Sequence, residues 1–207
     1  MKHQQVTVPP EWMDRSRRWA ERSVLGYERG EKERSRAYAR PGIDTSVDAQ
    51  LLGKAGECAF CCFMGLDPEQ LSWGPRCDDG WDVEYCNQLI DVKATGTEYL
   101  IWPVTKNEWL PRARATIFAS MHRLDRWRPE LFDIGGWCTK DHFIARHRVA
   151  PPPTFMDRGT KHLHRDDLWP MDQVRDSQFI RTLLLHRQCD VLPELFSPIH
   201  LSDLVAA

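Results

Sequence analysis

The 207-residue sequence contains no long hydrophobic run, and its longest is "AFCCFMGL" at residues 59–66. A helix that spans a bilayer needs about 20 apolar residues, so no membrane span is predicted. The first residues, "MKHQQVTVPPEW", also lack the apolar stretch of a signal peptide. We therefore expect a cytoplasmic protein with no membrane partner.

The sequence also has little excess charge of either sign. Its 28 Lys and Arg residues and 30 Asp and Glu residues give a formal net charge of −2. Proteins that bind nucleic acid usually carry a basic footprint, so any such binding would depend here on a local patch or a metal ion. One basic patch lies at residues 140–165. Within it, Lys161 and Arg165 are candidate contacts to a nucleic-acid backbone, or plain surface.

A disulfide framework is missing too. The seven cysteines are an odd number at irregular spacing, and several lie in a predicted helix, which favours reduced thiols. Cys58 and Cys61 form a C-x-x-C pair, but no second pair at metal-binding spacing accompanies it. Buried apolar thiols are therefore favoured over a structural zinc site.

What the sequence does contain is enough apolar material for one sizeable core, with 42% hydrophobic residues. Apolar periodicity predicts helices at residues 10–29 and 47–64, and strand patterns follow between residues 81 and 138. We expect an α+β (α/β) fold with a central mixed β-sheet flanked by helices. The predicted divisions are an N-terminal helical appendage (1–45), a core (46–145) and a C-terminal loop and helix extension (146–207).

The helix predicted at residues 47–64 carries two internal glycines, Gly53 and Gly56. A glycine inside a helix costs about 1 kcal/mol relative to alanine, so we expect another backbone, such as a sheet, to approach closely there. Glu57 follows in the same apolar helix. Because an unpaired carboxylate is costly to bury, we expect Glu57 to have a partner or to stay partly hydrated.

A hairpin with an ordered charge pattern is predicted at residues 80–95, "GWDVEYCNQLIDVKAT". We place a tight turn at Asn87 and Gln88, because asparagine tolerates the left-handed backbone of such turns. This register pairs Val83 with Val92. Since side chains alternate along a strand, one face is charged and the other apolar. The charged face holds Asp82, Glu84, Asp91 and Lys93, and the apolar face holds Val83, Tyr85, Ile90 and Val92.

Two interpretations of the charged face are open. In the first, the face meets solvent, and Asp82 and Lys93 form an exposed pair that contributes less than about 1 kcal/mol. In the second, the carboxylates bind a hard divalent cation, which reconciles like charges at close range. Asp78 and Asp79 add negative charge just before the hairpin. Together with Glu57 from the preceding helix, they favour the second interpretation.

The order of these residues resembles the PD-(D/E)XK nuclease superfamily, whose members share a restriction endonuclease-like core and include Holliday-junction resolvases and phage-type nucleases. The matching residues are Gly56-Glu57 in a helix, Asp82 at the first strand, and Asp91-Val92-Lys93 on the second strand. The resemblance covers about residues 50–105 and, more loosely, the strands up to residue 138. In place of the family's proline before Asp82 the chain has tryptophan, and the gap from Asp82 to Asp91 is short.

The resemblance implies a Mg²⁺-dependent nuclease that acts on DNA, with Mn²⁺ as a substitute cation. Asp82 and Asp91 would bind the metal directly, together with the main-chain carbonyl of Val92. Glu57 would reach the metal directly or through water.

The same resemblance gives Lys93 the task of orienting the attacking water and offsetting charge in the transition state. Asp79 is an alternative to Asp82 as the first acidic ligand, because the gap between the strand acids is short. Glu84 and Thr95 are accessory candidates on the same face. A threonine in a strand, however, needs no function.

A second hypothesis keeps this fold without the reaction. The protein would then be a catalytically inactive module that binds nucleic acid or a protein partner, such as a host-directed inhibitor. The complete set of Glu57, Asp82, Asp91 and Lys93 favours the enzyme, while the slightly acidic net charge favours the binding module. The sequence is compatible with a homodimer in either case.

Nine tryptophans raise the question of base stacking. Most of them fall at helix or strand positions where packing suffices as an explanation. Only Trp73 and Trp81, beside the proposed acidic cluster, are candidates from the sequence.

Overall fold

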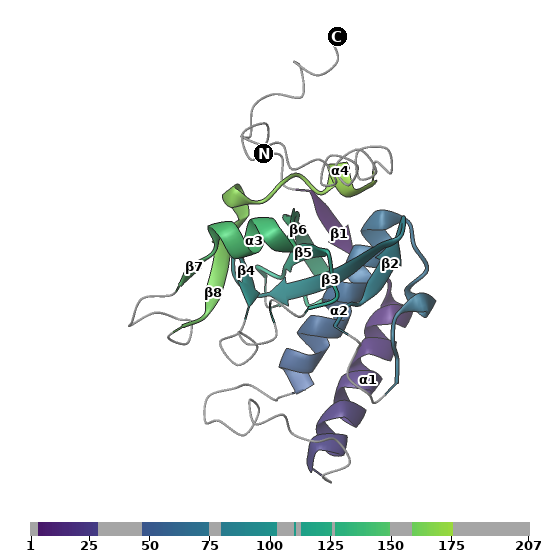
Figure 1. Ribbon diagram of the computed structural model, residues 1–207. Coiled ribbons are helices and arrows are strands. Elements are labelled where there is room, and N and C mark those ends of the chain that lie inside the picture. The colour runs from purple at the N-terminus through teal and green to yellow at the C-terminus, as the bar shows by residue number, and fades with distance from the viewer. Residues whose placement is uncertain are drawn as a thin grey trace. The chain divides into compact units, whose positions relative to one another are not determined.

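The computed structural model describes residues 4–28, 47–74, 80–102, 110, 113–125, 127–149 and 159–175. The chain divides into two compact units, Met1–Met171 and Asp172–Ala207. In the first unit, the helices are α1 (Pro10–Glu28), α2 (Val47–Met64) and α3 (Lys140–Arg146). Its strands are β1 (Gln5–Thr7), β2 (Val83–Tyr85), β3 (Gln88–Thr95), β4 (Tyr99–Trp102), β5 (Ile117–His122), β6 (Leu131–Thr139), β7 (Arg148–Val149) and β8 (Lys161–His164) (Figure 1). Helix α4 (Asp172–Arg175) belongs to the second unit.

A five-stranded mixed sheet forms the centre of the first unit, with the strand order β1-β6-β5-β3-β2. β3 and β5 run parallel, whereas the other neighbouring pairs are antiparallel. A second, three-stranded sheet has the order β4-β8-β7. The predicted α+β class, with a central mixed sheet flanked by helices, is confirmed.

Helix α2 packs closely on β3, and α1 packs along α2 (Figure 1). At Gly56, an added Cβ atom would overlap the side chain of Ala94, so only glycine fits this contact. The close approach predicted from the sequence is therefore confirmed for Gly56. It is wrong for Gly53, where an added Cβ would meet nothing within 4 Å.

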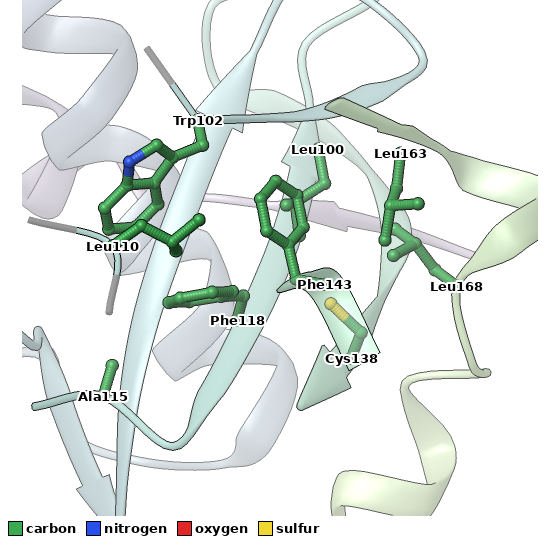
Figure 2. Close-up of a cluster of buried hydrophobic side chains, with 9 residues drawn as sticks. All are labelled: Leu100, Trp102, Leu110, Ala115, Phe118, Cys138, Phe143, Leu163 and Leu168. Carbon is green, nitrogen blue, oxygen red and sulfur yellow. The ribbon is translucent and has the colours of Figure 1, made fainter. Parts of the chain in front are cut away.

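The other face of the large sheet is covered by the small sheet and α3. Figure 2 shows the hydrophobic cluster between them, in which Trp102 of β4 contacts Phe118 of β5 with ring centroids 5.3 Å apart. Phe118 lies beside Asp91 in the parallel register of β3 and β5, so both side chains are on this covered face. The remaining members of the cluster are Leu100, Leu110, Ala115, Cys138, Phe143, Leu163 and Leu168.

The helices predicted at residues 10–29 and 47–64 are confirmed within the described ranges. The division predicted at residues 45 and 145 stays a prediction, although β1 extends the central sheet by pairing with β6. None of the described helices combines the length and apolarity needed to cross a membrane.

Candidate active site

The hairpin that carries the proposed acidic residues turns at Cys86 and Asn87, which both have a left-handed backbone (φ 50° and 62°). This two-residue turn pairs Val83 with Ile90. The predicted turn at Asn87 and Gln88, which paired Val83 with Val92, is wrong. Because the partners shift by two positions, each side chain of β3 keeps its predicted face.

Asp91 and Lys93 lie two residues apart on β3 and form an ion pair. Their side chains are only 9% and 18% exposed, and the Lys93 ammonium lies 5.1 Å from the centre of the Trp102 ring. The interpretation of this face as a solvated surface is therefore wrong for these two residues. The pair therefore lies in a place with little water, where charges interact more strongly than at the surface.

Asp82 lies just before β2 and forms two hydrogen bonds with β3. Its N–H donates to the carbonyl of Ile90 (2.8 Å), and its carboxylate accepts from the N–H of Val92 (2.7 Å). Val92 lies between Asp91 and Lys93 in the sequence. The hairpin therefore anchors the Asp82 carboxylate to the main chain between Asp91 and Lys93, and their membership of one site stays a prediction.

Glu57 has a different partner. On α2, the Lys54 ammonium forms an ion pair with the Glu57 carboxylate, and it also donates to the carbonyl of Ser72 (3.0 Å). Lys54 is only 4% exposed and Glu57 14% exposed. The spacing of three residues in a helix is the sequence signal for such a pair. The expectation that a buried Glu57 has a partner is confirmed.

The position of α2 relative to β3 bears on the proposed role of Glu57. Gly56 of α2 contacts Ala94, whose side chain points to the face of β3 opposite to that of Asp91 and Lys93. Among the residues that the structure describes, no group of three or more His, Cys, Asp and Glu side chains could hold a metal ion. A site that used Glu57 together with the strand carboxylates would share the Glu57 carboxylate with Lys54.

The accessory residues differ in their surroundings. Asp79 lies outside the described residues, and Glu84 is exposed on β2. The hydroxyl of Thr95 accepts a hydrogen bond from the N–H of Thr97 (2.8 Å), which stabilises the turn after β3. This contact gives Thr95 a structural role that explains its presence.

The two proposed nucleic-acid contacts are less accessible than the sequence suggests. The guanidinium of Arg165 donates to the carboxylate of Glu98 (3.2 Å), and only 12% of its side chain is exposed. A phosphate would have to compete with that carboxylate. Lys161 is half-buried on β8, where it pairs with Trp102 and Val149 in the small sheet.

A buried polar pair on β5, Ser120 and His122, was not singled out from the sequence as part of the site. The two side chains lie beside Lys93 and Thr95 in the β3–β5 register, and their Oγ and Nε2 atoms are 2.7 Å apart. Burial lowers the pKa of His122 to about 4, so its ring is neutral near neutral pH. The ring fills the space beside Gly135, where a Cβ atom would clash with it.

The C-x-x-C pair is part of the core. Cys58 and Cys61 are buried on α2, and burial raises the pKa of both thiols to about 12. Cys58 also contacts the hydroxyl of Ser16 on α1, with Sγ and Oγ 3.5 Å apart. These thiols are protonated and packed, in agreement with the apolar interpretation.

Comparisons of the chain with protein-family models, with curated proteins and with solved structures found no match. Membership of the PD-(D/E)XK superfamily therefore stays a prediction from the residues of the hairpin and α2.

Proposed function

We propose that the protein is a Mg²⁺-dependent nuclease that hydrolyses phosphodiester bonds in DNA. One observation carries the proposal: Asp91 and Lys93 form a mostly buried pair on one face of β3, and the carboxylate of Asp82 is held at the residue between them. Carboxylates that can bind a divalent cation, next to a lysine that can offset developing negative charge, suit metal-assisted hydrolysis of a phosphodiester.

The donor chemistry of the hairpin fits Mg²⁺. This ion prefers oxygen ligands and is usually held by one or two carboxylates, while waters and substrate phosphates complete its shell. Asp82 and Asp91 would provide the two carboxylates, and the carbonyl of Val92 a further oxygen. Mn²⁺ accepts the same ligands and would substitute. When bound, the metal would activate a water and neutralise the phosphate.

Lys93 contributes a positive charge whose position is fixed. Its ammonium is bonded to Asp91 and lies over the ring of Trp102, so it is already oriented before substrate binds. In the reaction, it would donate hydrogen bonds to the attacking water or to a phosphate oxygen and offset the charge that develops there. Glu57, in its ion pair with Lys54, is assigned a secondary role.

Cleavage of DNA by the wild type and by Lys93→Ala tests the proposal. Supercoiled plasmid, linear duplex, single strand and a branched junction would each be incubated with Mg²⁺ or Mn²⁺. We expect metal-dependent cleavage that falls at least about 100-fold in Lys93→Ala, as for the loss of one preorganised charge. Absence of cleavage of every DNA substrate and of RNA by the wild type contradicts the proposal.

Lys140→Ala is the matched control. Lys140 is also a half-buried lysine with a hydrogen bond, which its ammonium donates to the carbonyl of Ala113 (2.9 Å). Because Lys140 lies outside the hairpin, its removal should lower stability without abolishing cleavage. Equal losses of cleavage in both variants would point to unfolding as the cause.

The inactive binding module is the second candidate, and one observation favours it. The charges of Lys93 and Asp91 satisfy each other in the folded protein, as in a purely structural ion pair. This candidate predicts binding of nucleic acid or a protein partner without cleavage under any metal condition.

A further inference from the structure

The connection between β5 and β6, residues 123–130, has the sequence RLDRWRPE, and the structure describes residues 123–125 and 127–130 of this turn. The Asp125 carboxylate accepts from the N–H of Trp127 (2.9 Å), and its carbonyl accepts from the N–H of Arg128 (3.2 Å). The N–H of Leu131 then donates to the carbonyl of Arg128 (3.0 Å). These hydrogen bonds hold the main chain of the described residues around Trp127.

Trp127 is 79% exposed, and Leu124 in the same turn is 44% exposed. Every other tryptophan in the described part of the chain is buried or half-buried. The two tryptophans singled out from the sequence are used in packing: Trp73 stacks on Trp12 with ring centroids 5.9 Å apart, and Trp81 packs against the core cluster. A single exposed apolar side chain is ordinary, so the surroundings of Trp127 must identify a partner.

The charges of the turn favour a polyanion. Residues 123–130 contain three arginines and two acidic residues. Asp125 holds the turn, and Glu130 pairs with the Nε atom of Arg128 (3.5 Å), whose side chain is still 55% exposed. Arginines interleaved with an exposed aromatic ring are typical of surfaces that bind single-stranded nucleic acid.

The turn also lies at the end of the strand that carries the proposed site. The N–H of Arg123 donates to the carbonyl of Thr95, the last residue of β3 (2.8 Å). Lys93 is two residues earlier, which is about 7 Å along a strand. One helical turn of duplex DNA spans about 34 Å. A nucleic acid engaged at Lys93 is therefore long enough to reach the turn.

We propose that Trp127 stacks on an unpaired base of a single-stranded segment of the nucleic-acid substrate, next to the strand cleaved at Lys93. Arg128, which is 55% exposed, would contact a phosphate next to that base. This inference rests on the proposed nuclease function, and it names single-stranded or frayed nucleic acid as the substrate class. A rigid aromatic ring suits this task because every base offers a face for stacking.

Binding without divalent cations tests the inference, because no cleavage then disturbs the measurement. Fluorescence anisotropy would compare a labelled single-stranded oligonucleotide with a blunt duplex of the same sequence. We expect Trp127→Ala to weaken single-strand binding about tenfold, and Trp127→Phe to retain most of it. Duplex binding should change less. Leu25→Ala removes another exposed apolar side chain (47% exposed) and should leave both affinities unchanged.

Several results would overturn the inference. Unchanged single-strand binding by Trp127→Ala, equal losses on both ligands, or no binding by the wild type would each do so. Sedimentation would expose a different use of Trp127: if the wild type self-associates and Trp127→Ala does not, the ring is a contact between copies of the chain.

The cleavage assay separates this inference from the proposed function. Cleavage by the wild type, with unchanged single-strand binding by Trp127→Ala, would refute the stacking role and leave the nuclease intact. Single-strand binding that depends on Trp127, without cleavage, would refute the nuclease and leave the stacking role intact.

Discussion

Breaking the ion pair between Lys54 and Glu57 should strongly destabilise the protein. The pair is mostly buried, with exposed fractions of 4% and 14%, and Lys54 also donates to the carbonyl of Ser72. Lys54→Met leaves the Glu57 carboxylate with little water and without the Lys54 ammonium. Losses of this kind are about 3–5 kcal/mol, and because Glu57 keeps some contact with water, we expect the lower end, about 3 kcal/mol.

Replacing both partners should restore much of the stability. In Lys54→Met with Glu57→Met, neither charge remains buried, and the apolar side chains can pack against the neighbouring ring of Trp19, which now lies 4.6 Å from the Lys54 ammonium. Such replacements of a whole buried pair are often neutral or stabilising. We expect the free energy of unfolding of the double variant to lie within about 1 kcal/mol of that of the wild type.

Urea unfolding, followed by circular dichroism, measures the free energy of unfolding of the wild type, the two single variants (Lys54→Met and Glu57→Met) and the double variant. The exposed pair of Arg15 and Glu69, with exposed fractions of 32% and 58%, serves as the control, and Glu69→Gln should cost less than about 1 kcal/mol. If the two single losses simply add up in the double variant, the reasoning about the pair is wrong. Cleavage by the restored double variant then decides the role of Glu57, because a stable protein that no longer cuts DNA would place Glu57 in the active site.

Two further predictions concern the helix and the buried histidine. Gly56→Ala should destabilise the protein by about 1–3 kcal/mol in urea unfolding, because the added Cβ overlaps Ala94. Gly53→Ala should instead stabilise it by up to about 1 kcal/mol. Similar effects of the two substitutions would refute the tight contact at Gly56. His122 has a pKa of about 4 in the folded protein, compared with an ordinary value of 6.5, so the unfolded chain takes up a proton first as the pH falls. The free energy of unfolding should therefore decrease by about 3 kcal/mol between pH 6.5 and pH 4, and a variant with His122→Asn should lose this part of the pH dependence.

The face of the hairpin on which each side chain lies could be predicted from the sequence, whereas the pairing register of the two strands could not. Two registers that differ by two residues place every side chain on the same face, so the apolar pattern cannot distinguish them. The choice depends on the turn, which uses Cys86 in a left-handed conformation that this residue type seldom adopts. A rule that prefers asparagine at the start of the turn therefore selects the wrong pair of residues.

The burial of the candidate site could not be predicted from the sequence either. Asp91 and Lys93 are covered because β4 pairs with β8, about 60 residues further along the chain, and brings Trp102 over the hairpin. Nothing local in residues 80–95 encodes that pairing. The partner of Glu57, in contrast, is only three residues away and could have been predicted from helix geometry.

The two ion pairs differ in the carboxylates that accompany them. Lys54 and Glu57 pair within α2, which suits a structural pair. Asp91 and Lys93 also pair with each other, but the carboxylate of Asp82 accepts a hydrogen bond from the N–H of Val92, the residue between them. The hairpin therefore provides two carboxylates, and Mg²⁺ is usually held by one or two carboxylates. This second carboxylate is why the hairpin, rather than α2, is the better candidate for a metal-dependent site.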